Sequence, residues 1–244
     1  MIGAGIAEAF AGIPAGNEIL WLIMLLLNFA GILAVYRLFG RVGLFAWVPI
    51  AVIIANIQVI KTVQLFGLTS SLGNIVYATS FLATDILSEN YGKKNAGRAV
   101  GIGFLSLVSL TVLMNVALWF EPAVIDFAQD SMETLYSLLP RIALASFVAY
   151  GVSQAHDVWA YDLWKRRRPE GRWIWLRNNA STMVSQAIDS VIFVTIAFAG
   201  VVPVGDFWQI VATTYVLKWI VAAADTPLVY LAARWHRLGK VRED

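Results

Sequence analysis

Long apolar stretches separated by short polar segments constrain this chain more than any other feature of its sequence. Roughly 20 apolar residues cross a bilayer as a helix. Stretches that approach or exceed this length run over Asn17–Phe39, Leu44–Phe66, Leu72–Asn90, Ala96–Phe120, Leu138–Trp164, Leu176–Gly200 and Phe207–Trp235. Only 14% of the residues are charged and the mean hydropathy is +0.70, whereas soluble domains carry about 25% charged residues. The pattern predicts an all-α, polytopic membrane protein with seven transmembrane helices, and disfavours a soluble protein with long buried helices.

Helix is the only secondary structure open to these stretches, because lipid cannot pair the edge of an open sheet and the alternation typical of a barrel strand is missing. Lysine and arginine are concentrated in alternate connections. The basic positions are Arg37 and Arg41, then Lys93, Lys94 and Arg98, then 165–168, Arg172 and Arg177, then Arg234, Arg237, Lys240 and Arg242. Basic connections stay in the cytoplasm. The N-terminus is therefore predicted outside and the C-terminus inside.

Several classes of function are disfavoured by what the sequence lacks. There is no cysteine, which excludes disulfides and thiolate metal sites. Neither the His-Glu-x-x-His nor the Gly-x-Ser-x-Gly pattern occurs. The run "KRRRPEGR" at 165–172 is typical of a cytoplasmic loop beside anionic lipid, so nucleic acid is not an expected partner. We expect no enzyme, no metal and no cofactor, with an intramembrane aspartyl-type dyad as the remaining enzymatic alternative.

Ionisable side chains inside the predicted spans are the main candidates for function. Such groups cost several kcal/mol in a bilayer and usually mark a site. They are Lys61, Asp85, Asp157, Asp189, Lys218 and Asp225, with Glu89 at the end of a span. The structural alternative is a pair of ion pairs facing the bundle interior. Four acids and two lysines cannot all pair one to one, so we interpret the set as functional.

Helical spacing gathers these groups and their polar neighbours into stripes. The stripes contain Asn74, Phe81, Asp85 and Glu89 in the third stretch and Tyr150, Ser153, Gln154, Asp157 and Tyr161 in the fifth. They contain Asn178, Thr182, Ser185, Gln186, Asp189 and Phe193 in the sixth and Tyr215, Lys218 and Asp225 in the seventh. In the second stretch Gln58 and Lys61 are neighbours, while Asn56 points about 140° away from Lys61 at the helical step of about 100°. Lipid cannot accommodate such stripes, so they are predicted to face one another around a polar cavity.

The chemistry of this predicted cavity favours a planar heterocycle. Carboxylates only accept hydrogen bonds, amides both donate and accept, and aromatic rings supply stacking faces. Two adjacent N–H donors on a guanine-like ring would suit one carboxylate. A metal ion would require more carboxylates or histidine, and the chain has only two histidines.

Four segments of the sequence resemble the queuosine precursor transporter family, also called the "putative vitamin uptake transporter" family. They are "ANIQVIK" at 55–61, "FLATDILSENYGKKNAGRAV" at 81–100, "RIALASFVAYGVSQAHDV" at 141–158 and "LRNNASTMVSQAIDSVIFVTIAFAG" at 176–200. The resemblance implies an inner-membrane importer of 7-cyano-7-deazaguanine, its aminomethyl derivative or queuine, which feed queuosine synthesis in tRNA. It also implies a six-helix core similar to the substrate-binding subunits of energy-coupling-factor transporters. That core would span 44–235 of a single domain, with 17–39 as an additional helix.

The resemblance and the polar stripes together define the predicted substrate site. Its residues are Lys61, Phe81, Asp85, Glu89, Gln154, Asp157, Asn178, Gln186, Asp189 and Lys218. Asp85 or Asp189 would accept hydrogen bonds from the base, and the lysines would neutralise excess acid. Three questions stay open. The chain could be a substrate-binding subunit that needs a separate ATPase, and it could form homo-oligomers. Import could use proton coupling or facilitated diffusion with metabolic trapping.

Overall fold

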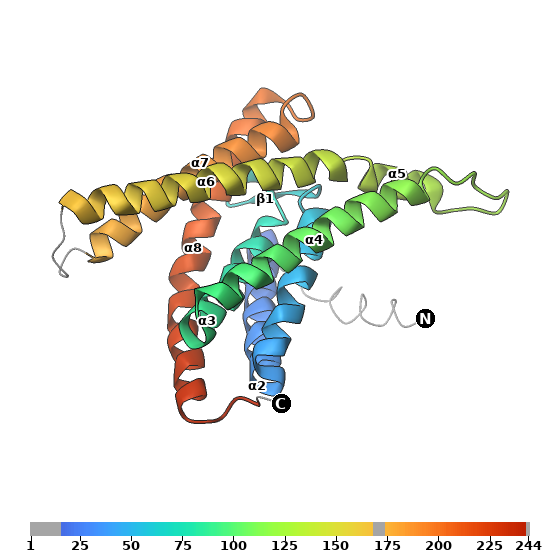
Figure 1. Ribbon diagram of the computed structural model, residues 1–244. Coiled ribbons are helices and arrows are strands. Elements are labelled where there is room, and N and C mark those ends of the chain that lie inside the picture. Colours follow the sequence, from blue (N-terminus) through green and yellow to red (C-terminus); the bar gives the residue numbers. More distant parts are fainter. Residues whose placement is uncertain (1–15, 168–173, 243–244) are drawn as a thin grey trace.

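The computed structural model describes residues 16–167 and 174–242, and the side chains nearest to the gap at 168–173 are described only in part. The protein is mostly helical, with one small β-hairpin (Figure 1). Its elements are α2 (Asn17–Gln58), β1 (Thr62–Leu65), β2 (Leu68–Ser71), α3 (Asn74–Tyr91), α4 (Lys93–Ala117), α5 (Gln129–Tyr136), α6 (Leu139–Arg167), α7 (Ile174–Phe198) and α8 (Val204–Arg237).

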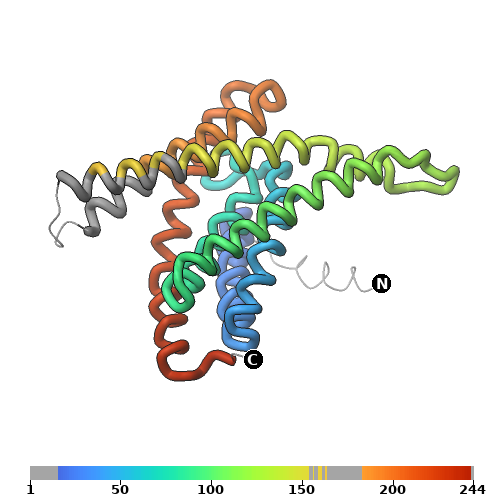
Figure 2. Tube along the Cα trace, in the orientation of Figure 1, coloured from blue at the N-terminus to red at the C-terminus, as the bar shows by residue number. Residues whose placement is uncertain are grey.

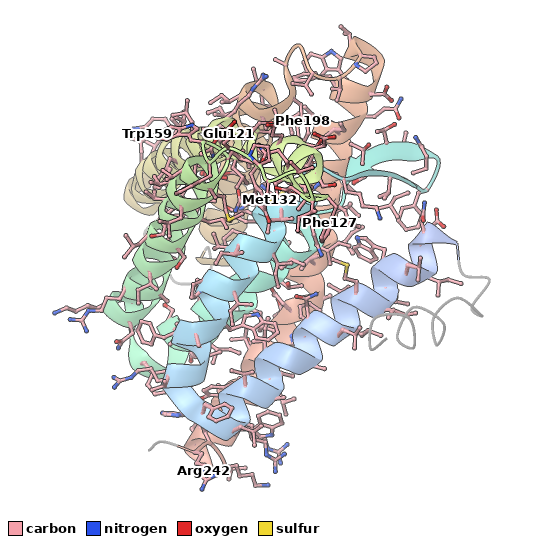
Figure 3. The ribbon with its side chains drawn as sticks, turned by 90° about the vertical axis from the view of Figure 1, so that its right-hand side faces the viewer. Glu121, Phe127, Met132, Trp159, Phe198 and Arg242 are labelled. Atoms are coloured by element: carbon pink, nitrogen blue, oxygen red, sulfur yellow. The ribbon has the colours of Figure 1, made fainter. Side chains whose placement is uncertain are left out.

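Helix α2 covers the first predicted span and the larger part of the second, and the chain reverses its direction at Gly40 between them. The backbone there has φ 55° and ψ −136°, in the positive-φ region that favours glycine. Gly31 and Trp47 lie against each other across the reversal, so the two arms are antiparallel. Figure 3 shows the arms meeting close to Arg242, whose backbone N–H donates to the Arg37 carbonyl at 3.2 Å.

Four of the described helical segments are long and apolar enough to cross a membrane. They are Asn17–Gln58, Lys93–Ala117, Gln129–Ser153 and Val204–Arg237, with Met183–Phe198 as a shorter apolar helix. Many large apolar side chains on these segments are exposed, including Leu26, Leu105, Leu113 and Val216. Exposed apolar patches of this extent are unusual in a soluble monomer and are normal on a surface that faces lipid. The protein is therefore a polytopic membrane protein. These four segments do not by themselves give the predicted count of seven spans.

The prediction that the second span continues as a helix to Phe66 is wrong. The helix ends at Gln58, and β1 and β2 form an antiparallel hairpin in which Thr62 pairs with Ser71. Phe66 and Gly67 connect the strands with φ values of 52° and 75°. Positive φ at both positions of a two-residue loop is the requirement of a type I′ turn, which glycine satisfies readily. Lys61 therefore lies between the helix and the hairpin and is exposed, not inside a span.

The hairpin is fixed to the ends of two helices by hydrogen bonds. At the start of α8, Gln209 accepts from the Thr69 backbone N–H and Asp206 accepts from the Thr69 hydroxyl, each at 2.8 Å. At the start of α2, the Glu18 carboxylate accepts from the Phe66 backbone N–H at 2.9 Å. These contacts satisfy backbone groups that would otherwise be left open at the hairpin turn. The hairpin consequently holds α2 and α8 together at one end.

The helices form two groups that meet at α7 and α8. The larger apolar core lies among α2, α3 and α8, with Ile32, Leu44, Leu82 and Ile86 fully buried. Helices α6 and α7 lie side by side as a long hairpin that runs across this group (Figures 1 and 2). Arg141 at the start of α6 donates to the Ile196 and Ala199 carbonyls near the end of α7, which fixes the two helices together.

Candidate functional site

A buried ion pair joins the two groups of helices. The Lys218 ammonium of α8 donates to the Asp189 carboxylate of α7, and the two side chains are only 6% and 9% exposed. Either charge alone would be costly at such a position, because removal from water penalises an unpaired ion by several kcal/mol. Pairing makes the site neutral overall. It also fixes the position of one hydrogen-bond acceptor and one donor at the junction of the helices.

Two further helices contribute groups to this ion pair. From α6, the Ser153 hydroxyl donates to the Asp189 carboxylate at 3.4 Å. From α3, the ring of Tyr77 lies with its centroid 5.2 Å from the Lys218 ammonium, within the range of a cation–π contact. Four helices therefore converge on one pair of charges. Multi-helix convergence of this kind is how helical bundles build ligand sites from side chains on facing helices.

The ion pair lies in the wall of a cavity with about 400 Å³ of empty space. Its lining residues are Ala55, Asn56, Val59, Gly73, Asn74, Tyr77, Ser146, Ala149, Asp189, Phe193 and Lys218. This volume includes space that is open to the surroundings of the protein, so it is an upper bound on the room for a ligand. The lining combines one carboxylate and one ammonium with two amides, a hydroxyl and two aromatic rings. This composition suits a small, flat, polar ligand better than a bare ion.

The two asparagines of the cavity differ in how far they are already engaged. Asn74 donates from its amide to the Thr214 hydroxyl at 2.8 Å, and no hydrogen bond among the described residues uses its side-chain oxygen. Asn56 donates to the Val52 carbonyl at 2.7 Å and accepts from the Ser146 hydroxyl at 3.3 Å. The Asn74 oxygen is thus an available acceptor, whereas Asn56 is held in place by its own helix and by α6.

A second cavity of about 510 Å³ adjoins the first, and the two share Asn56, Tyr77 and Ser146. Its remaining lining residues are mostly apolar or aromatic: Val48, Val52, Ser80, Phe81, Thr84, Val100, Phe104, Leu107 and Tyr150. Tyr77 and Phe81 are in edge-to-face contact, with ring centroids 5.4 Å apart. The structure therefore has a charged cavity beside α7 and α8 and a less polar one between α3 and α4, with Tyr77 between them.

The sequence-predicted site residues fall into separate locations. Asp189 and Lys218 line the first cavity and Phe81 lines the second. Gln186 is half-buried and lines neither; its side-chain oxygen has no hydrogen-bond partner among the described residues. Three others are exposed and line neither cavity, namely Lys61, Asp85 and Glu89. The side chains of Gln154, Asp157 and Asn178 lie outside the described part of the structure.

Sequence reasoning did not point to Asn56, Tyr77 and Ser146, which line the first cavity. It placed Asn74 and Phe193 on stripes facing the cavity but did not select them as site residues. Asn56 was placed on the wrong face because the prediction took Lys61 as the reference, and the helix ends before Lys61. A usable signal was present, since an amide inside an apolar helix is itself costly unless it is hydrogen-bonded. Tyr77 and Ser146 gave a weaker signal, because both residue types are common in transmembrane helices.

Comparison with known proteins places the chain in a family. The family model described as "Putative vitamin uptake transporter" matches residues 71–232, well over half of the chain. The chain belongs to this transporter family. A protein of Bacillus subtilis (strain 168) named "Probable queuosine precursor transporter" is 43% identical over 218 residues, which cover 89% of this chain and 95% of the relative. The "Queuosine precursor transporter" of Escherichia coli (strain K12) is 28% identical over 59% of this chain and 62% of its own length.

Family membership agrees with the physical features of the transporter. It is a multi-pass membrane protein of a transporter family and not an enzyme, as the sequence predicted. The matched residues 71–232 include Asp189, Lys218, Tyr77 and Asn74, so the charged cavity lies largely within the family region. No solved structure gives a significant match to the chain.

Proposed function

We propose that this protein imports queuosine precursors of the 7-deazaguanine class through the inner membrane, and that the Asp189–Lys218 cavity binds them. The relative from Bacillus subtilis, which matches over almost its full length, supports the substrate class. The observation that carries the assignment to this cavity is the buried ion pair, which places a carboxylate and an ammonium among amide, hydroxyl and aromatic side chains.

The donors and acceptors of the cavity match those of a guanine-like base. The Asp189 carboxylate accepts from the ring N–H and the exocyclic amine, and the Lys218 ammonium donates to the ring carbonyl. The Asn74 oxygen offers a further acceptor, while Tyr77 and Phe193 provide aromatic surfaces. Because the ion pair is neutral overall, a neutral base can enter without leaving an unbalanced charge in the membrane. The adjoining, less polar cavity has room for the substituent at position 7.

Uptake by the chain alone tests this function. We expect a bacterial strain that lacks both its own importer and precursor synthesis to regain queuosine in its tRNA when it expresses this protein and receives a precursor. Supplying 7-cyano-7-deazaguanine, the aminomethyl derivative and queuine separately identifies the preferred substrate. A host without energy-coupling-factor components distinguishes a self-sufficient carrier from a substrate-binding subunit, since the latter would give no uptake. Absence of queuosine with all three precursors in any host would contradict the proposal.

We also propose seven spans, with the N-terminus outside and the C-terminus in the cytoplasm. The reversal at Gly40 supports the separation of 17–39 from the rest of the bundle. The sequence has no cysteine, so a single introduced cysteine is the one residue of the chain that a maleimide labels. Cysteines replacing Leu68 or Ser131, which are both exposed, are expected to react with an impermeant maleimide added outside intact cells, whereas one replacing Lys94 is expected to react only after lysis. Labelling of all three from outside, or of none, would contradict this topology.

A further inference from the structure

A second unusual carboxylate lies on α8, away from the charged cavity. Asp225 is only 5% exposed, yet no hydrogen bond or ion pair among the described residues involves it. Burial of an ionised carboxylate without a partner is strongly unfavourable, so such a group either binds something or carries a proton. The Lys218–Asp189 pair already accounts for the buried lysine of the same helix. Asp225 therefore lacks a cationic partner that would account for its burial, whereas Asp189 has Lys218.

A second acid lies at the level of Asp225 on the neighbouring helix. The contacts Asn74–Thr214, Tyr77–Lys218 and Tyr91–His236 fix the register of α3 against α8, and this register brings Asp85 of α3 to the level of Asp225. Asp85 is exposed, whereas Asp225 is buried. Two carboxylates that interact in a medium of low dielectric constant do not both remain ionised, and they hold one proton between them. An exposed acid beside a buried one also gives that proton a route in and out.

The acid pair lies on the same helix–helix contact as the charged cavity. Asp225 follows Lys218 by seven residues on α8, which is about two helical turns or roughly 10.5 Å. Asp85 follows Tyr77 by eight residues on α3, and Tyr77 lies over Lys218. Helices α3 and α8 pack directly against each other. A change in charge at Asp85 and Asp225 therefore acts on the two helices that position Tyr77 and Lys218.

The other ionisable groups of the surrounding helices are engaged elsewhere or lie farther along them. On α3, Glu89 is one turn beyond Asp85 and is exposed. On α7, Asp189 is held by Lys218. On α2, Arg37 lies over the ring of Trp235, with 5.3 Å to the centroid, and Tyr36 accepts from Asn90. Tyr91 of α3 and His236 of α8 contact each other edge to face near the ends of their helices, and Lys93, Lys94 and Arg98 begin α4.

A metal ion is a poorer occupant of this position than a proton. No group of three or more acidic or histidine side chains that could hold a metal ion occurs in the part of the chain that the structure describes. Metal ions of the hard class need about six or more oxygen ligands, which two carboxylates do not supply. A proton needs only one carboxylate oxygen, with the second carboxylate as acceptor.

We propose that Asp85 and Asp225 form a proton-binding site that couples import to the proton gradient, an inference that rests on the proposed transport function. A proton binds to one carboxylate oxygen of the pair while the site is open to the outside, and it leaves the same oxygen while the site is open to the cytoplasm. No other bond is made or broken. Protonation removes the repulsion between α3 and α8, and this change reaches Tyr77 and Lys218 along the same helices. Coupled sites of this kind typically influence each other about 5- to 150-fold.

The test uses the full-length protein in proteoliposomes with radiolabelled 7-cyano-7-deazaguanine. We expect an acidic exterior to drive accumulation in the wild type, with the membrane potential clamped and sodium absent. Asp225→Asn is expected to keep substrate exchange across the membrane while its gradient-driven uptake falls on the order of tenfold. Asp85→Asn replaces an exposed side chain and so does not threaten the fold, and its response to the gradient is expected to fall as well. Asp130→Asn on exposed α5 is the matched control and should respond like the wild type.

The outcomes separate failure of the coupling from failure of the transport function. Exchange by the wild type without any response to the pH gradient overturns the proton site alone. A response to a sodium gradient in place of the pH gradient overturns the choice of a proton. Full gradient-driven uptake by both Asp225→Asn and Asp85→Asn overturns the assignment to these residues. Absence of exchange with every precursor overturns the proposed function and the coupling with it.

Discussion

Replacement of Asp189 by Asn is expected to reduce precursor uptake by about 100-fold or more, which corresponds to about 3 kcal/mol. The carboxylate offers two oxygens that accept hydrogen bonds, and the amide replaces one of them with a donor. A base that presents two adjacent N–H groups then meets a donor where it needs an acceptor. Sites built around such polar pairing lose far more on mismatch than apolar pockets do, because a buried group is left unpaired. Initial uptake of labelled precursor and the queuosine content of tRNA both measure the effect.

The abundance of the Asp189→Asn protein in the membrane must be measured beside its activity. The Asn oxygen can still accept from the Lys218 ammonium, but that buried ammonium loses its counter-charge, so we expect a lower abundance and express uptake per amount of protein in the membrane. Asp130→Asn makes the same chemical change on the exposed helix α5 and serves as the matched control. Uptake that stays at the wild-type level in Asp189→Asn would remove this carboxylate from the site.

The membrane character and most of the helix positions could be predicted from the sequence, because lipid imposes long apolar segments on the chain. The predicted stretch Leu72–Asn90 corresponds closely to α3, Asn74–Tyr91. The β-hairpin escaped prediction because a search for apolar length alone does not distinguish a helix from a short pair of strands at its end. Thr62 and Val63 are β-branched and Gly67 stands four residues after Val63, which is the local signal for a strand and a turn.

The candidate site was only partly accessible to sequence reasoning. Charges in apolar helices are conspicuous, and Asp189 and Lys218 were selected for that reason. Which charges face each other depends on the packing of helices that are distant in the sequence, and no stripe pattern specifies that. Asp85 shares a stripe with Phe81, yet only Phe81 reaches a cavity. Asn56 was missed, and Asn74 was placed on a stripe but not selected, because an amide stands out less than a charge, although its burial is also costly.

A pair of variants at Lys218 distinguishes a functional ion pair from a structural one. Lys218→Met is expected to leave the Asp189 carboxylate buried without its cation, a defect that costs about 3–5 kcal/mol in other proteins. We expect low abundance in the membrane and a lower unfolding temperature in detergent. The double variant Asp189→Asn with Lys218→Met removes both charges, and replacement of a buried pair by uncharged groups is often neutral or stabilising. Its abundance and unfolding temperature should therefore return to near the wild-type values.

Uptake by the double variant then decides what the charges are for. If the pair only holds α7 against α8, restored folding restores transport, and the cavity has no need of a carboxylate or an ammonium. If the pair binds the base, the double variant is well folded and remains inactive, because the acceptor for the two N–H groups and the donor to the carbonyl are both gone. We expect the second result, since Asp189 and Lys218 line a cavity whose wall also carries two asparagine amides, a serine hydroxyl and two aromatic rings. Transport by the double variant at the wild-type rate would show that the pair is a structural clamp.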